Sequence, residues 1–343
     1  MASTSRNTTF SCFSSLLITF LVIPTSPAQE IPQKKSSTSL EKAEIKWIGQ
    51  WPSDESKLQE KKDSKKQVLN FIIGKKKIIL KRPVSVLASN QHSFWILDQG
   101  NNAVFQVDGD VGKIPHFIDK KNDNYTSLVG ICKFHDKEIL FTDSRSNKIF
   151  LVNTEKKECK VLNDTLKLNK PTGIAYSLLN KEIWVIETGT HRIVVLNEKG
   201  EIKKTIGSRG NANGEFNFPT HIWIDKKGNA YVTDAMNFRI QVFNNKGDVV
   251  SVFGSSGDKP GYFSSPKGVA TDSYGNIYVA DAMFHVVQVF DINGNFLYTF
   301  GSQGFDKGQF WMPSGMYIDD NDKIYIADSY NSRIQIFQLI TGK

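Results

Sequence analysis

Short runs of apolar residues recur along this chain, and six of them end in an acidic residue. The acids follow one another at intervals of 44 to 47 residues. They are Asp98, Asp143, Glu187, Asp234, Asp281 and Asp328. A constant period of this length indicates one supersecondary unit that is copied along the chain. Six copies of about 47 residues account for most of the 343 residues.

Each copy contains four short runs rich in Val, Ile, Tyr and Phe, which are favoured in half-buried strands. The first run begins at a proline, as at Pro219, Pro266 and Pro313, where a strand can start without donating a ladder hydrogen bond. Turn pairs such as Gly228-Asn229 separate the first run from the second. A four-stranded sheet repeated without intervening helices predicts an all-β fold, the six-bladed β-propeller.

The two ends of the chain are expected to close the ring. The sixth copy stops after its third run, at Phe337, while a matching run stands alone at residues 44–50. We therefore predict that residues 44–50 complete blade six, because closure removes the exposed strand edges of an open array. The propeller itself is predicted over residues 77–338, with a tail at 339–343.

The last three copies resemble the NHL repeat family of six-bladed propellers. The resemblance rests on Pro-x-Gly-Val-Ala-x-Asp at residues 266–272, Gly-Asn-Ile-Tyr-Val-Ala-Asp at 275–281 and Arg-Ile-Gln-Val-Phe at 239–243. The third copy is close to this pattern, and the first two are degenerate. The resemblance implies a bacterial exported NHL-repeat protein with a helical insert before the first blade.

Residues 1–28 have the pattern of a secretory signal peptide. Arg6 precedes an apolar stretch at residues 16–23 that is too short to span a bilayer, and small residues at 26–28 fit cleavage before Gln29. The chain is therefore expected to be exported to the periplasm or the extracellular space. The alternative interpretation is an uncleaved membrane anchor.

Two further segments flank the closing strand. Residues 29–43 are rich in Ser, Thr and Lys, which predicts a flexible tether. Residues 51–76 form a basic insert, in which the apolar pattern of residues 62–73 predicts a short amphipathic helix packed on the propeller. The alternative for residues 62–73 is an extra strand.

The formal net charge of +8 raises the question of a nucleic-acid partner. Export argues against one, and much of the excess charge lies in lysine runs between residues 61 and 77. We therefore expect no nucleic acid, although the basic insert could meet a membrane surface. Cys132 and Cys159 are predicted on the first and fourth strands of blade two, too far apart for a disulfide.

The repeating acids could suggest a cation site, but every copy has one. Carboxylates at the end of a strand commonly accept backbone N–H groups in the turn that follows, which predicts a structural role. Arg192, Arg239 and Arg333 stand five residues after an acid and can pair with the acids or with the loops.

Enzymes that resemble this fold, such as the peptide-amidating lyase, the gluconolactonases and the streptogramin lyases, place metal or acid–base residues at the top entrance of the channel. The resemblance places there the pair after each blade proline and the loop after each repeating acid. Among the residue pairs only His221 can ligate zinc, and zinc needs three or four ligands. His191 and His285 lie in the loops, so a three-histidine site is the alternative to turn histidines. We expect no catalytic residue, no metal and no cofactor.

Aromatic residues gather in the loops that precede the prolines. Phe216, Phe263 and Phe310 recur with the repeat and are predicted to pack between blades. Phe218 and Trp311 lie nearer the channel entrance, and such residue types carry binding energy at protein interfaces.

These patterns favour a protein- or ligand-binding scaffold over an enzyme. The predicted binding residues of the top face are Thr220, His221, Lys267, Trp311 and Ser314. The expected partner is another extracytoplasmic protein, which the resemblance places in a cytochrome-associated assembly. The alternative is a metal-dependent lyase or hydrolase of the amidating-lyase or gluconolactonase type.

Overall fold

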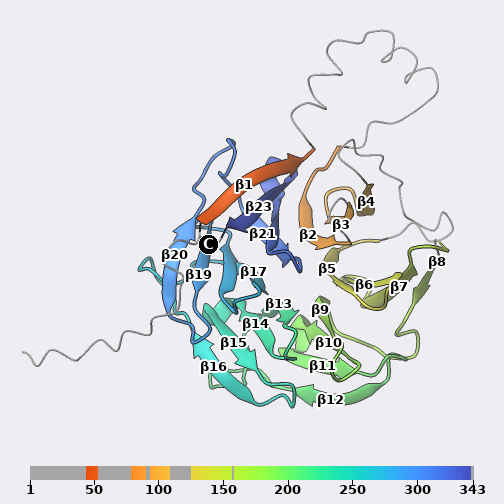
Figure 1. Ribbon diagram of the computed structural model, residues 1–343. Helices are drawn as coiled ribbons and strands as arrows, with labels where there is room; N and C mark the ends of the chain where they lie inside the picture. Colours follow the sequence, from red (N-terminus) through yellow and green to blue (C-terminus); the bar gives the residue numbers. More distant parts are fainter. Residues whose placement is uncertain (1–43, 53–78, 90–92, 109–124, 157, 341–343) are drawn as a thin grey trace, which may run out of the picture. The chain divides into compact units, whose positions relative to one another are not determined.

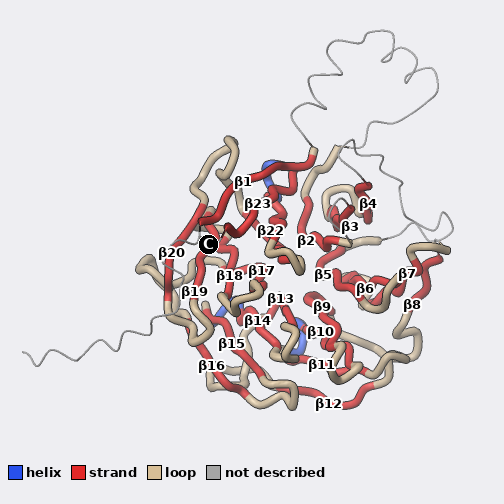
Figure 2. Tube along the Cα trace, viewed as in Figure 1, coloured by secondary structure: helices blue, strands red, loops and turns tan. Residues whose placement is uncertain are grey.

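The computed structural model describes residues 44–52, 79–89, 93–108, 125–156 and 158–340. The predicted signal peptide, tether and amphipathic helix lie outside the described residues. Within them the fold is almost entirely strand and connecting loop, as Figure 2 shows. No helix in this part of the chain is long and apolar enough to cross a membrane.

The described strands form six antiparallel sheets, and the first three strands of each follow chain order. The strands of the first three blades are β2 (Pro83–Ala88), β3 (Ser93–Asp98), β4 (Ala103–Asp108), β5 (Leu128–Lys133), β6 (Glu138–Asp143), β7 (Lys148–Asn153), β8 (Glu158–Val161), β9 (Pro171–Ser177), β10 (Glu182–Glu187), β11 (Arg192–Leu196) and β12 (Ile202–Ile206).

The next two blades consist of β13 (Pro219–Ile224), β14 (Ala230–Asp234), β15 (Arg239–Phe243), β16 (Val249–Phe253), β17 (Pro266–Thr271), β18 (Ile277–Asp281), β19 (Val286–Phe290) and β20 (Phe296–Phe300). The sixth blade contains β21 (Pro313–Ile318), β22 (Lys323–Asp328), β23 (Arg333–Ile340) and β1 (Glu44–Trp51). Each first strand packs against the first strand of the next blade, and β21 packs against β2. The ring is therefore closed, and the chain is a six-bladed propeller (Figure 1).

The outer strand of blade six comes from the other end of the described chain. β1 pairs antiparallel with β23, from Glu44 opposite Ile340 to Trp51 opposite Ile334. Trp47 Nε1 donates a hydrogen bond to Gln335 Oε1 at 3.0 Å, which fixes this register. β23 continues to Ile340, two residues past the predicted end of the propeller at residue 338. The reason is that β1 offers partners as far as Glu44.

The apolar core lies between neighbouring blades. Phe216, Phe263 and Phe310 are fully buried, each in a cluster that joins two consecutive sheets. The prediction that these residues pack between blades is confirmed. Burying one phenylalanine side chain contributes about 1.5–3 kcal/mol, and the same contact recurs at three successive blade junctions.

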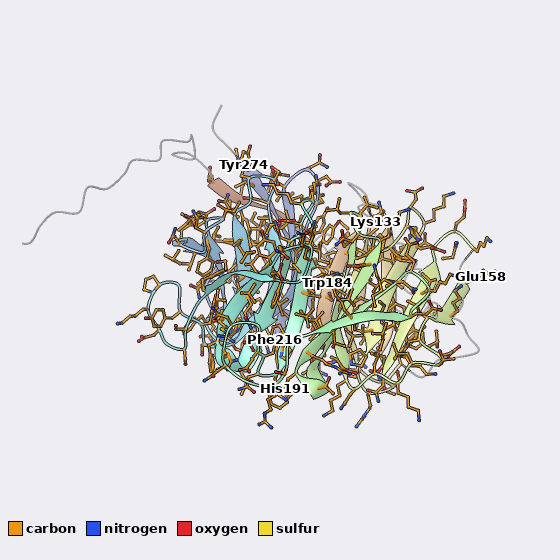
Figure 3. The ribbon with its side chains drawn as sticks, turned by 90° about the horizontal axis from the view of Figure 1, so that it is seen from below. Lys133, Glu158, Trp184, His191, Phe216 and Tyr274 are labelled. Carbon is orange, nitrogen blue, oxygen red and sulfur yellow. The ribbon has the colours of Figure 1, made fainter. Side chains whose placement is uncertain are left out.

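The loops that connect the strands lie at two opposite ends of the ring. The loops after each second strand and before each first strand share one end, which we call the top face. The loops between first and second strands lie at the opposite end, the bottom face. Figure 3 shows this in side view, with His191 of a top loop and Tyr274 of a bottom loop at opposite ends and Trp184 of β10 between them.

Candidate functional site

The repeating acids end the second strands at the top face, where they are fully buried. Asp281 accepts backbone N–H groups from Ser264 and Ser265, which precede the first strand of its blade. The same carboxylate accepts N–H groups from Met283 and Phe284 in the turn that follows. Asp98 and Asp143 each accept four backbone N–H groups in the same arrangement. Each acid thus ties the entry of its first strand to the exit of its second.

The other three acids use an arginine. Glu187 pairs with Arg192 at 2.6 Å, and Asp328 pairs with Arg333 at 2.7 Å. Asp234 pairs with Arg239 at 2.8 Å, and this guanidinium also donates to three loop carbonyls. The carboxylates are therefore occupied by groups of the protein. Across the described ranges, no group of three or more His, Cys, Asp or Glu residues could hold a metal ion.

His191 and His285 bond to loop backbone. His191 Nδ1 accepts the N–H of Phe218 at 3.0 Å, and His285 Nδ1 accepts the N–H of Met312 at 3.1 Å. Both histidines have a left-handed backbone, with φ of 56° and 59°. Each ring ties a loop of one blade to the loop that enters the next blade. Through these bonds, His191 and His285 connect consecutive blades of the ring.

His221 lies on the wall of the central cavity. It occupies the third residue of β13, where four other first strands have glycine, namely Gly130, Gly173, Gly268 and Gly315. The cavity has a volume of about 190 Å³ and is lined by residues of all six first strands. A Cβ at Gly173 would lie 2.9 Å from His221 Cα, so the glycines allow neighbouring first strands to approach closely.

The electrostatic surroundings keep the His221 ring neutral. Burial, and secondarily the nearby charge of Lys267, lower the pKa of His221 to about 3. His221 Nδ1 lies 3.1 Å from Thr220 Oγ1. When the hydroxyl of Thr220 donates this bond, the proton of the neutral ring resides on Nε2, which can then donate to a ligand.

Three of the predicted binding residues share one position of the repeat. Thr220, Lys267 and Ser314 are each the second residue of a first strand, on β13, β17 and β21, and each is half-buried. These three strands are neighbours in the ring. Burial lowers the pKa of Lys267, and the nearby charge of Asp281 offsets only part of this shift. Within the described residues, no carboxylate lies within 4.0 Å of its ammonium.

Trp311 lies on the loop that enters blade six, two residues before Pro313. Its backbone N–H donates a hydrogen bond to Asp328 Oδ1 at 2.8 Å. The residue is half-buried, and its ring contacts that of Phe305, with centroids 4.8 Å apart. Phe305 is 66% exposed. Trp311 therefore supports an exposed aromatic side chain of the top face, outside the channel wall.

Sequence reasoning missed an exposed apolar row on the same face. Met236, Met283 and Tyr330 are 54%, 54% and 59% exposed, and each stands two residues after a repeating acid. With Phe218 and Phe305 they form what we call the apolar arc, on the top loops of blades four to six. The equivalent residues of blades one to three are Gly100, Arg145 and Gly189. The repeat register was a signal that could have revealed this asymmetry.

The lower part of the cavity is aromatic. Tyr176, Trp223 and Tyr317 line it together with Cys132. The rings of Trp223 and Tyr317 meet edge to face, with centroids 5.4 Å apart. Cys132 lies on β5 and Cys159 on β8, at opposite edges of one sheet, and neither is in a disulfide. The predicted placement of both cysteines is confirmed.

Two family models match parts of the chain. Residues 310–337 match the NHL repeat, and residues 163–230 match a family of 6-bladed beta-propellers. No curated protein matches the sequence.

Many solved structures share the fold. An auxiliary nutrient binding protein from Bacteroides thetaiotaomicron is 15% identical, with a TM-score of 0.61 over 76% of this chain and 70% of that one. A structural genomics protein of unknown function from the same organism is also 15% identical, with a TM-score of 0.61 over 77% and 71%. Virginiamycin B lyase from Staphylococcus aureus is 18% identical, with a TM-score of 0.55 over 77% and 98%. At these identities the likeness shows the fold alone.

Proposed function

For an NHL-type six-bladed propeller with this top face, we propose a role as an exported scaffold that binds a protein through its top face. The observation that carries the proposal is the apolar arc. It places five large, exposed apolar side chains on neighbouring blades, namely Phe218, Met236, Met283, Phe305 and Tyr330. Aromatic residues and methionine are enriched at protein interfaces, where a few such side chains supply most of the binding energy.

The position of the arc in the fold supports this proposal. Its side chains stand on loops, whereas the strands beneath them are held by the carboxylate network of Asp234, Asp281 and Asp328. A loop surface on a rigid scaffold is the usual location of binding residues. Structural neighbours with this fold include both a nutrient binding protein and a lyase, so the fold alone does not decide the function. The proposed binding role therefore rests on the apolar arc.

Export is the second part of the proposal. It is supported by the apolar stretch at residues 16–23 and the small residues before Gln29, a pattern typical of secretory signals. The expected partner is therefore another periplasmic or extracellular protein. The resemblance to bacterial exported NHL-repeat proteins suggests a cytochrome-associated assembly.

Affinity purification from the exported fraction, followed by mass spectrometry, tests the proposal. The mature chain should capture a partner, and joint substitution of Met283→Ser and Tyr330→Ser should abolish capture without changing the melting temperature. Leu178→Ser with Leu179→Ser is the matched control, because these leucines are 78% and 60% exposed on the bottom face. Capture that survives the top-face change, but is lost when the lysines between residues 61 and 77 are neutralised, would move the interface to the basic insert.

A further inference from the structure

We propose that the top end of the central cavity beside blades four to six, which we call the channel mouth, binds a carboxylate of the partner polypeptide. The carboxylate would be held by Lys267, His221 and the hydroxyls of Thr220 and Ser314. The apolar residues around that carboxylate would lie on the apolar arc. This inference rests on the proposed top-face function and specifies its ligand as an acidic residue within an apolar segment.

The first argument is that Lys267 forms no ion pair with a described carboxylate. A partly buried cation loses hydration, and this loss is offset when a carboxylate pairs with it. The buried and half-buried arginines of the top face follow this rule, since Arg192, Arg239 and Arg333 each lie 2.6–2.8 Å from an acid. Lys267 is half-buried, and no described carboxylate pairs with it. The charge of Asp281 acts on Lys267, but no ion pair joins the two, and this carboxylate is already bonded to four backbone N–H groups.

The second argument is the set of neutral donors beside Lys267. Among the described residues, the ring of His221 has its one hydrogen bond to Thr220 Oγ1, which leaves Nε2 available. Ser314, which also carries a hydroxyl, occupies the equivalent position of the neighbouring strand β21, on the other side of Lys267. One ammonium with an imidazole N–H and hydroxyl groups suits a carboxylate, which carries one charge and accepts several hydrogen bonds.

The charge count separates a carboxylate from a phosphate. The second residues of the six first strands include one cation, and they are Val84, Val129, Thr172, Thr220, Lys267 and Ser314. The third residues add no charge, since they are Ser85, four glycines and the neutral His221. Phosphate groups and nucleic-acid backbones are commonly held by arginine clusters or several lysines. Lys133 also lines the cavity, but it ends β5 toward the bottom face. Lys267 is therefore the one cation among these top-face positions, which matches a single carboxylate.

The source of the carboxylate follows from the apolar arc. Lys267, Thr220 and Ser314 belong to blades four to six, and the arc covers the loops of these same blades. A free small acid would contact the mouth and leave the arc uncovered. A polypeptide can place an Asp or Glu in the mouth while its neighbouring apolar residues cover Met236, Met283 and Tyr330.

Two pools of capped hexapeptides test the inference. Both pools carry randomised apolar residues around one central position, which is Glu in the first pool and Gln in the second. Peptides retained by the immobilised mature chain are counted by mass spectrometry. We expect the Glu pool to be retained at least tenfold better than the Gln pool. This ratio should fall to near one in Lys267→Met and persist in Lys267→Arg.

Lys259→Met is the matched control, because Lys259 is an exposed lysine on the top loop that enters the same blade. It should leave the ratio unchanged, and all variants should keep the wild-type melting temperature. Equal retention of both pools, or an unchanged ratio in Lys267→Met, would overturn the carboxylate site and leave docking on the apolar arc intact. Displacement of the Glu pool by acetate or succinate at equal concentration would show that the channel mouth prefers a small organic acid. That result would overturn the polypeptide as the ligand. Retention of neither pool would overturn the carboxylate site, and partner capture by the wild type would then decide the proposed function separately.

Discussion

At the scale of single residues, the acid that ends each second strand finds its hydrogen-bond and ion-pair partners in two ways. Asp98, Asp143 and Asp281 are held by backbone N–H groups, whereas Glu187, Asp234 and Asp328 are held in part by an arginine five residues later. Both arrangements join the entry of the first strand to the exit of the second. Because a buried carboxylate must be paired or hydrogen-bonded, the acid can recur in every blade without forming a cation site.

Asp143→Asn tests the hydrogen-bonded arrangement. Burial alone would raise the pKa of Asp143, but hydrogen bonds from Thr126, Ser146 and Ser127 outweigh it and lower the pKa. The stabilisation by this carboxylate is therefore complete above the unfolded pKa and is lost as pH falls through the lower folded pKa. We expect Asp143→Asn to lose about 1–3 kcal/mol of unfolding free energy at pH 7. Urea unfolding should show this loss shrinking below pH 4, and a pH-independent loss would contradict the account.

His285→Ala tests the histidine bond between blades. The change leaves the Met312 N–H without its acceptor and places alanine at a φ of 59°. We expect a loss of about 1–3 kcal/mol. His285→Asn should lose less, since asparagine tolerates the left-handed region and keeps an acceptor. Thermal unfolding measures both variants, with His135→Ala as the exposed control, and equal losses in all three would argue against the bond.

At the scale of elements, the loop that enters each of blades four to six is built on a contact between glycine and phenylalanine. The first glycine of each loop has a positive φ, and a Cβ there would overlap the ring of the following Phe216, Phe263 or Phe310. The glycine therefore allows the positive φ of the loop and also leaves room for the phenylalanine ring. This explains why Gly-Ser-x-Gly and Gly-x-Phe recur together in the sequence.

Gly301→Ala and Gly308→Ala separate the two effects. Both glycines have a positive φ, of 89° and 78°, but only Gly301 lies against an aromatic ring. We expect Gly308→Ala to cost about 1–2 kcal/mol from backbone strain alone. Gly301→Ala should cost more, because Phe310 must also move. Chemical denaturation of the two proteins gives the difference, and a smaller loss in Gly301→Ala would show that the ring adapts freely.

The sequence predicts elements better than surfaces for a physical reason. Strands, the blade period and the positions of Thr220, Lys267 and Ser314 follow from register, which a repeat transmits from one copy to the next. Exposure at Met236 or Tyr330 depends on how far a loop stands above the sheet, and the apolar pattern does not encode that height. The role of Trp311 beneath Phe305 likewise depends on a loop conformation set by the Asp328 bond.

At the scale of the whole molecule, the ring depends on a strand that is remote in sequence. β1 supplies the fourth strand of blade six, so the two ends of the propeller are joined by main-chain pairing. The side chains add to this, since Trp47 bonds Gln335 and Gln50 bonds Arg333. Arg333 in turn holds Asp328 and three carbonyls of the loop that enters the blade. The closing strand is therefore coupled to the top face of blade six.

Removal of β1 tests this coupling. A chain that begins at Ser53 should melt well below a chain that begins at Glu41, which differs only by the closing strand and its flanks. The loss includes burial of Trp51 and pairing along β23, so we expect at least about 3 kcal/mol and an exposed strand edge that promotes self-association. Calorimetry measures the stability, and light scattering measures the association. Because neighbouring blades share their cores, the whole ring should lose stability in one transition. Unchanged melting of the shorter chain would show that β1 adds little to closure, and a separate low-temperature transition would confine its effect to blade six.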